Sequence, residues 1–146
     1  MELKGVKAAK DFEGKYCEEE NDKLKVKRIP RSTKYRLLKR LAEMGYLEQL
    51  EGVDKRYRYY KLSSKGEAFK GRLLKSILKE LLEASNLSPY ERQLLELTKL
   101  SKQIEVPFRD FKRISCSYGI PPKLLLETLD TRVAEKLGNK VVVIKL

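Results

Sequence analysis

The stretch "RSTKYRLLKRLAEMGYLEQLEGVDKRYRYYKLSSKGEAF", residues 31–69, carries the most regular pattern of the chain. After Pro30, either Ser32 or Thr33 can cap the free amides of a helix. Gly45 is a typical helix stop, so we predict a helix over residues 32–44. Its apolar residues recur every three positions and should face the core, namely Tyr35, Leu38, Leu41 and Met44.

A β-hairpin should follow this helix directly. Residues 46–51 alternate as a strand, "GVDK" at 52–55 makes a turn, and residues 56–62 form the return strand. Alternation places Tyr57 and Tyr59 on one face of the return strand and Arg56, Arg58 and Tyr60 on the other. Tyrosines that alternate in a hairpin more often pack in the sheet than stack on bases, so we expect packing here.

A longer helix should run from Ser63 or Ser64 to about Ala84. Its apolar stripe is wider than one small hairpin can cover: Phe69, Leu73, Leu74, Ile77, Leu78, Leu81 and Leu82. We expect this stripe to pack either on C-terminal helices of the same chain or on the same helix of a second subunit. "SNLSP" at 85–89 breaks the helix, which predicts two domains over residues 1–86 and 87–146.

The remaining segments are less regular. Residues 4–16 favour a short helix, whereas 17–29 read either as a strand around "LKVKRI" or as a highly charged helix. Beyond the boundary we predict helices near 90–104, 107–118 and 121–137, then a terminal strand "KVVVIKL" at 140–146. Residues 107–137 resemble a helix-turn-helix with Gly119 in the turn, but the second of these helices carries little net charge.

The charge of the chain points to a polyanionic partner. Lys and Arg number 33 against 21 Asp and Glu, a formal charge of +12, with a pI near 9.7. From Lys23 to Ala42 there are nine cations and no acid, directly after the acidic "EEEND" of residues 18–22. Such an excess favours nucleic acid first and an anionic membrane surface second. The alternative is a basic but merely solvated surface.

Several classes of chemistry lack the residues that they need. The chain has no His, no Gly-rich phosphate loop and no paired-carboxylate pattern, so we expect neither an enzyme nor a cofactor. Two cysteines, Cys17 and Cys116, are too few for a zinc site; we take them as buried free thiols, with a disulfide as the alternative. The absence of His and Trp beside abundant Lys and Glu suggests a thermophilic source.

The location of the protein is also an expectation from composition. No apolar run approaches the ~20 residues that cross a bilayer, and the first residues have no apolar signal segment. We therefore expect a soluble, cytoplasmic and nucleoid-associated protein without a membrane partner.

The residues "IPRSTKYRLLKRLAEMGYLEQ" and "RYYKLSSKGEAF" resemble the winged-helix transcription regulators of the MarR and PadR type, common in bacteria and archaea. In that family a helix beginning "ST-x-Y-R-x-L-K-R-L" enters the DNA major groove, and "G-Y-L" opens a basic hairpin called the wing. The resemblance covers residues 29–70. It departs upstream, because the family has an apolar helix where residues 17–28 are almost all charged.

The resemblance implies a set of DNA-binding residues. In the recognition helix they would be Arg31, Ser32, Thr33, Lys34, Arg36, Lys39 and Arg40, and in the wing Lys55, Arg56 and Arg58. Cations in both elements would neutralise phosphates, while the helix would reach base edges.

These observations together predict an α+β, mainly helical fold: a winged helix-turn-helix domain followed by a small helical C-terminal domain, which could be a second helix-turn-helix. The expected function is a homodimeric regulator that binds double-stranded DNA. The alternatives are a replication, partition or chromatin-associated DNA-binding protein, or a protein-interaction module.

Overall fold

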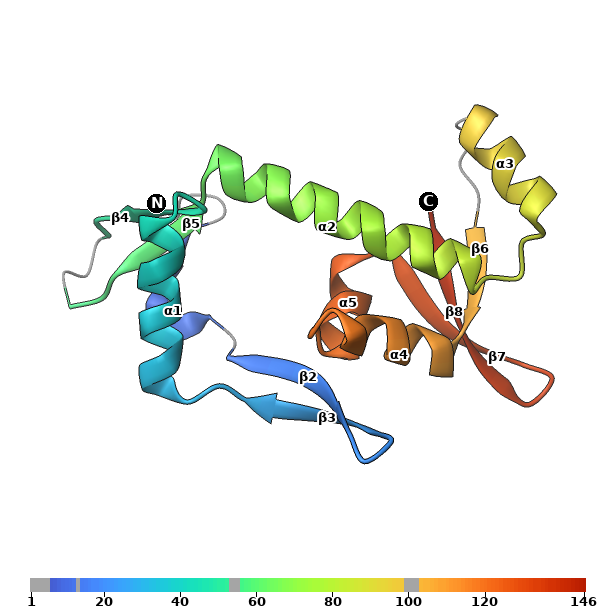
Figure 1. Ribbon diagram of the computed structural model, residues 1–146, viewed down its shortest axis with the longest axis horizontal. Helices are drawn as coiled ribbons and strands as arrows, with labels where there is room; N and C mark the ends of the chain where they lie inside the picture. Colours follow the sequence, from blue (N-terminus) through green and yellow to red (C-terminus); the bar gives the residue numbers. More distant parts are fainter. Residues whose placement is uncertain (1–5, 13, 53–55, 99–102) are drawn as a thin grey trace. The chain divides into compact units, whose positions relative to one another are not determined.

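The computed structural model describes residues 6–12, 14–52, 56–98 and 103–146 (Figure 1). The chain forms two compact units that are not consecutive in sequence. The first comprises the described residues within Met1–Gly14 and Arg28–Leu74, and the second comprises Lys15–Lys27 together with those of Lys75–Leu146. Helix α2 (Ser64–Glu83) begins in the first unit and ends in the second.

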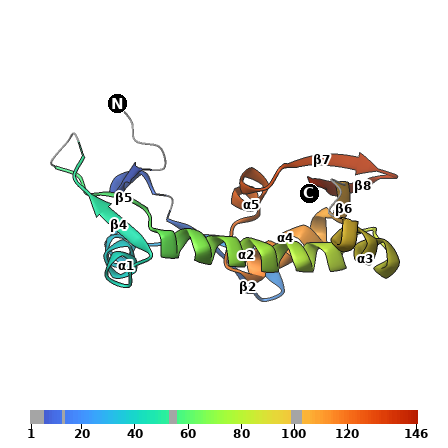
Figure 2. The same ribbon diagram turned by 90° about the horizontal axis from the view of Figure 1, so that it is seen from above.

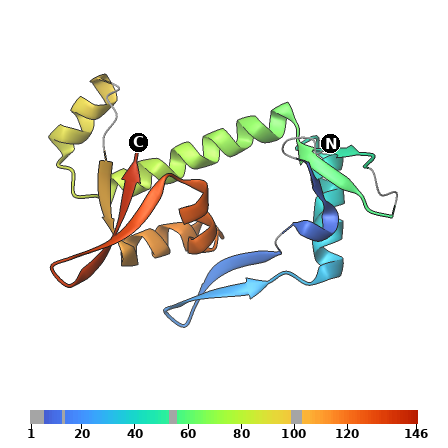
Figure 3. The same cartoon turned by 180° about the vertical axis from the view of Figure 1, so that it is seen from behind.

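The first unit consists of a three-stranded antiparallel sheet and a helix. Its elements are β1 (Lys7–Ala8), the 3-10 turn η1 (Ala9–Asp11), α1 (Arg31–Glu43), β4 (Leu47–Leu50), β5 (Tyr59–Leu62) and the start of α2. The strand order is β1-β5-β4, and Leu47 pairs with Leu62 while Leu50 pairs with Tyr59. Figure 3 shows β1 beside β5, so that the first strand pairs with the last.

A small core joins α1 to this sheet. Ala9, Leu38, Leu47 and Tyr60 are buried together, and Phe12 meets Tyr60 edge to face with ring centroids 6.3 Å apart. The core-facing residues of α1 are Tyr35, Leu38 and Ala42. Leu41 and Met44, predicted to be core residues, are instead 39% and 47% exposed.

The turn after α1 and the start of α2 depend on two glycines and a serine. Gly45 has φ +87° just beyond α1, as its position after the helix predicts. Ser63 caps α2: its hydroxyl donates to the Gly45 carbonyl and accepts the Gly66 N–H at 3.0 Å. A Cβ on Gly66 would lie 2.1 Å from the carbonyl oxygen of Tyr46, so the chains approach closely there.

The second unit combines a hairpin, a sheet and several helices. Its strands are the pair β2 (Lys15–Glu20) and β3 (Lys23–Arg28), and the sheet of β6 (Gln103–Pro107), β7 (Thr131–Lys136) and β8 (Asn139–Lys145) in the order β6-β8-β7. Its helices are α3 (Pro89–Thr98), α4 (Phe108–Ser117) and α5 (Pro122–Thr128), besides the end of α2. In Figure 2, β7 and β8 run side by side as a hairpin that follows α5.

The core of this unit buries the C-terminal half of α2. Ile77 and Leu81 are fully buried. Residues of β6, β8, α4 and α5 are buried as well: Ile104, Val106, Phe111, Leu125, Val142 and Ile144. The α2 stripe therefore finds a partner within the chain over this half, which was one of the two predicted alternatives. Phe69, in the first unit, stays 49% exposed.

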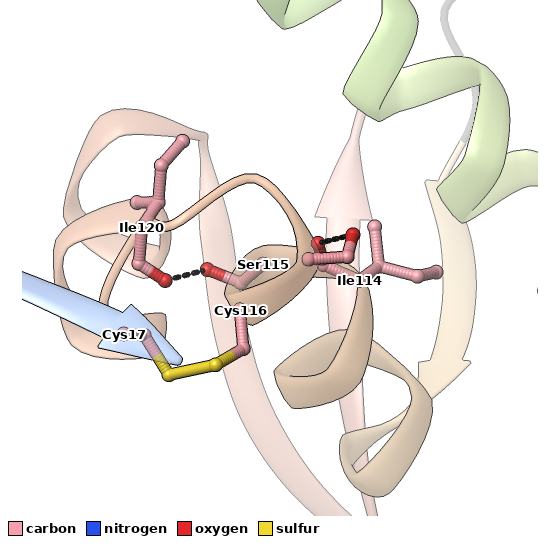
Figure 4. Close-up of a disulfide and its surroundings, with 6 residues drawn as sticks. Cys17, Ile114, Ser115, Cys116 and Ile120 are labelled. Carbon is pink, nitrogen blue, oxygen red and sulfur yellow. Dashed lines mark hydrogen bonds between the residues drawn. A yellow bond between two sulfur atoms is a disulfide. The ribbon is translucent and has the colours of Figure 1, made fainter. Parts of the chain in front are cut away.

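A disulfide between Cys17 and Cys116 joins the β2–β3 hairpin to α4 (Figure 4). The Cys17 N–H also donates to the carbonyl of Gly119, at 3.0 Å. Beside the bond, the buried Ser115 hydroxyl donates to the carbonyl of Ile120 at 2.7 Å and closes the turn between α4 and α5. The expectation of two free thiols is wrong, because the hairpin brings together residues 99 positions apart.

The prediction of a mainly helical fold is also wrong. The described residues form α+β units with three antiparallel sheets, and the C-terminal region contains one of these sheets instead of being a small helical domain. The winged helix-turn-helix expected around α1 is not found there, because the segment before α1 is the β2–β3 hairpin and not a helix. The strand reading of "LKVKRI" is the right one of the two that the sequence left open.

Other boundaries differ by element. The helices predicted at 32–44, 64–84 and 107–118 and the strand at 140–146 are confirmed within a residue or two. The helix predicted over 4–16 is wrong in its described part, which forms β1, η1 and the start of β2. The helix predicted over 121–137 ends at Thr128, and that over 90–104 ends at Thr98, with residues 99–102 outside the described ones.

Candidate nucleic-acid interface

The outer face of α1 presents cations to solvent. Arg36, Lys39 and Arg40 are all exposed and lie away from the face that carries Leu38. Among the described residues, none of these three takes part in an ion pair. Glu43 is the one acidic residue in the helix. The face can therefore offer its positive charge to an external anion.

A cavity of about 330 Å³ lies where α1 begins. Three segments of the first unit line it, contributing Ala9, Lys10, Arg31, Tyr35, Arg56, Tyr57, Arg58 and Tyr60. Four of these residues are cationic and three are tyrosines, and none of the described lining residues is acidic. Guanidinium and ammonium groups gathered in this way fit a phosphate or carboxylate ligand.

The tyrosines of the cavity wall are held among these cations. The Lys10 ammonium lies 4.0 Å from the centroid of the Tyr57 ring, and the Arg56 guanidinium carbon lies 5.6 Å from it. The Arg31 guanidinium carbon is 5.6 Å from the centroid of Tyr35. Such cation–π contacts stabilise the cations close to aromatic faces and fix the position of the positive charge.

The β4–β5 hairpin supplies part of the wall. Tyr60, a residue of β5, is buried, as expected for sheet packing, whereas Tyr57 is only half-buried. Arg56, Arg58 and Tyr60 line the cavity together with Tyr57, which was predicted on the opposite face. The return strand predicted over 56–62 begins only at Tyr59, so its alternation does not extend to residues 56–58. Lys55 lies outside the described residues.

The other predicted residues of α1 differ in surroundings. Lys34 donates from its ammonium to the carbonyls of Phe12 at 3.2 Å and Lys10 at 3.5 Å, so it ties the N-terminal segment to the helix. Ser32 is exposed at the first turn, and Thr33 is half-buried. Arg31 belongs to the cavity and not to the outer face.

The long basic run of the sequence divides between the two units. Lys25 and Lys27 lie on β3, where Lys27 pairs with Glu18 and with Glu20, the latter at 2.6 Å. The hydrogen bonds that Lys27 donates, to Glu18 first and Glu20 second, raise the pKa of Lys27 above its usual range. Because Lys25 and Lys27 already form ion pairs with acidic residues of β2, we do not include them in the candidate interface.

Sequence reasoning missed Lys10 and Tyr35 as cavity residues. Lys10 reaches the cavity because β1 pairs with β5, with Ala8 opposite Tyr59, and this pairing spans some fifty residues of sequence. Tyr35 was expected only as a core residue, and it contacts the core while also lining the cavity. No local pattern signals either position.

An apolar stripe runs beside the basic face of α1. Leu37, Leu41 and Met44 are spaced by four and three and are 40%, 39% and 47% exposed. The regulators that the sequence resembles have an apolar helix before the recognition helix, whereas the residues before α1 in this chain form the β2–β3 hairpin, which belongs to the second unit except for Arg28.

Comparison with models of protein families, with curated proteins and with solved structures finds no match to this chain. The likeness to MarR and PadR regulators thus rests on residues 29–70 alone. Within the described residues, no helix is long and apolar enough to span a membrane, and no cluster of His, Cys, Asp and Glu is arranged to hold a metal ion.

Proposed function

We propose that the protein binds duplex DNA through α1 and the β4–β5 hairpin and acts as a transcription regulator. The observation that carries this proposal is the exposed row of Arg36, Lys39 and Arg40, unpaired among the described residues, beside a cation-lined cavity. An α-helix fits the major groove, where arginine can contact guanine, while cations beside it bind phosphates.

We assign a second copy of the chain as the partner that covers the apolar stripe of Leu37, Leu41 and Met44. Two-fold association would cover these side chains and double the basic surface, which suits a palindromic DNA site. The same stripe also favours the second candidate function, a protein-interaction module in which the basic face meets an acidic partner.

Selection of bound fragments from random duplex DNA tests the function directly. Enrichment of one motif, repeated at fixed spacing, is the result expected of a dimeric regulator. Retention of fragments without any enriched motif would indicate an architectural DNA-binding protein. Failure to retain duplex above low salt would overturn the proposal and favour the interaction module.

A further inference from the structure

The cavity at the start of α1 is larger than a phosphate group needs. Its volume of about 330 Å³ is at the lower end of the ~300–1,000 Å³ typical of small-molecule sites. A ligand that fills it must have more atoms than one phosphate.

The wall of the cavity joins aromatic surface to positive charge. Tyr35 and Tyr57 are half-buried, so part of each ring remains accessible, and both carry cations near their faces. Aromatic side chains stack on nucleobases, and arginines bind phosphate oxygens. A nucleotide satisfies both requirements at once, because it carries a planar base and a phosphate on one sugar.

We infer that this cavity binds one nucleotide whose base is not stacked in a duplex, with the base against Tyr35 and Tyr57 and the phosphate near Arg31, Arg56 and Arg58. Where the nucleotide belongs to DNA bound by α1, the inference rests on the proposed function. The same chemistry would also fit a free mononucleotide, and the experiment below separates the two sources.

The test compares two DNA duplexes that differ by one inserted nucleotide. Both carry the preferred site, and one has a single unpaired 2-aminopurine at its edge. Because a bulged base has no pairing partner, its entry costs less than that of a paired base, and we expect the bulged duplex to bind about tenfold tighter, consistent with the stacking of one base. The fluorescence of 2-aminopurine should fall when the protein is added.

Variants of the wall identify the cavity as the source of this gain. Tyr35→Leu and Tyr57→Leu, tested separately, should each bring the ratio of the affinities for the bulged and paired duplexes down from about ten toward one, whatever the variant's affinity for the paired duplex. Tyr90→Leu is the matched control, because Tyr90 is a 76% exposed tyrosine of α3 in the other unit. Thermal unfolding of each variant verifies that it is folded, and the comparison of the two duplexes with wild-type protein is independent of all of them.

The remaining outcomes are distinct. Equal affinity for both duplexes with unchanged fluorescence would show that the nucleotide in the cavity does not come from the bound DNA. The proposed function would then still stand. If adenosine monophosphate then binds in calorimetry, and Tyr57→Leu removes that binding, the ligand is a free nucleotide. If the mononucleotide also fails to bind, the inference is overturned. Failure of both duplexes to bind overturns the proposed function, and the mononucleotide titration alone then decides the fate of the cavity assignment.

Discussion

Gly66 and Gly71 lie in the same helix, α2, but have opposite surroundings. A Cβ at Gly66 would meet the Tyr46 carbonyl oxygen at 2.1 Å, whereas a Cβ at Gly71 would meet nothing within 4 Å. Gly66→Ala should lower the free energy of unfolding by about 1–2 kcal/mol, because overpacking outweighs the gain in helix propensity. Gly71→Ala should raise it by about 0.5–1 kcal/mol. Urea titration measures both; stabilisation by both substitutions would contradict the close approach.

The arginines of the candidate interface should differ in what they contribute to DNA binding. Arg36→Ala or Arg40→Ala should cost about 1–3 kcal/mol on a preferred site and relax base preference there. Arg58→Ala, which alters the cavity wall, should weaken binding to all sequences about equally. Fluorescence anisotropy on matched and mismatched duplexes measures this, with Arg132→Ala on β7 as the control. Control of base preference by Arg58 would refute the assignment of α1 to the groove.

At the scale of single elements, the β2–β3 hairpin depends on a bond between distant residues. Breaking the Cys17–Cys116 disulfide, which closes 99 residues, should lower the free energy of unfolding by about 2–5 kcal/mol. Reduced wild type and the double variant Cys17→Ala, Cys116→Ala should unfold at similar temperatures, and reductant should have no effect on the variant. An unchanged Tm after complete reduction, verified by thiol titration, would count against this role.

The sequence predicted elements where local signals agreed with tertiary pairing. For α1, Gly45 and the apolar spacing point to one helix, and that helix forms; the predicted cap by Ser32 or Thr33 is wrong, because both lie inside the helix and its N-cap is Pro30 without a side-chain hydrogen bond. After α5 the local pattern misleads, because Leu129 and Val133 continue a helical period. Pairing with β8 makes residues 131–136 a strand instead, and the turn at Leu137 and Gly138 takes positive φ angles. The pairing partner is the neighbouring "VVVIK" segment of β8, so the outcome depends on a contact between segments and not on the helical period of residues 121–137 alone.

At the scale of the whole molecule, the two units share an arrangement that the sequence does not reveal. Each has a strand, an intervening segment and a hairpin whose second strand pairs with the first, giving the orders β1-β5-β4 and β6-β8-β7. The intervening segment contains α1 in one unit and α4 with α5 in the other. Residues 15–27 belong to the second unit, to which the Cys17–Cys116 disulfide joins them, and nothing in their composition indicates this.

The candidate site was predictable where it depends on local pattern and unpredictable where it depends on pairing between distant segments. Arg36, Lys39 and Arg40 lie on the outer face of a helix whose period is readable, so their exposure follows from local pattern. The cavity depends on β1 pairing with β5, and its volume and its Lys10 are properties of tertiary structure. The basic run from Lys23 overstated the interface, because Lys25 and Lys27 pair with Glu18 and Glu20 of β2.

The proposed interface makes a quantitative prediction for salt dependence. Seven exposed cations belong to the outer face of α1 and the cavity: Lys10, Arg31, Arg36, Lys39, Arg40, Arg56 and Arg58. If six or seven phosphates are neutralised per copy, log K should fall with log salt at a slope of about −6. Affinity should then drop by about 10³-fold or more between roughly 50 and 200 mM salt.

The slope also reports the number of copies on one duplex. Two copies on a palindromic site should give about −12 per duplex, and sedimentation of the complex should find two chains. A Leu41→Glu, Met44→Glu variant should bind as one copy with about half the slope, because charges in the exposed stripe prevent its burial between subunits. Arg36→Ala with Arg40→Ala should instead reduce the slope by about 2 per copy without changing the number of chains. Tight binding with a slope near zero would refute the phosphate contacts, and one chain per duplex with a slope near −6 would refute the dimer alone.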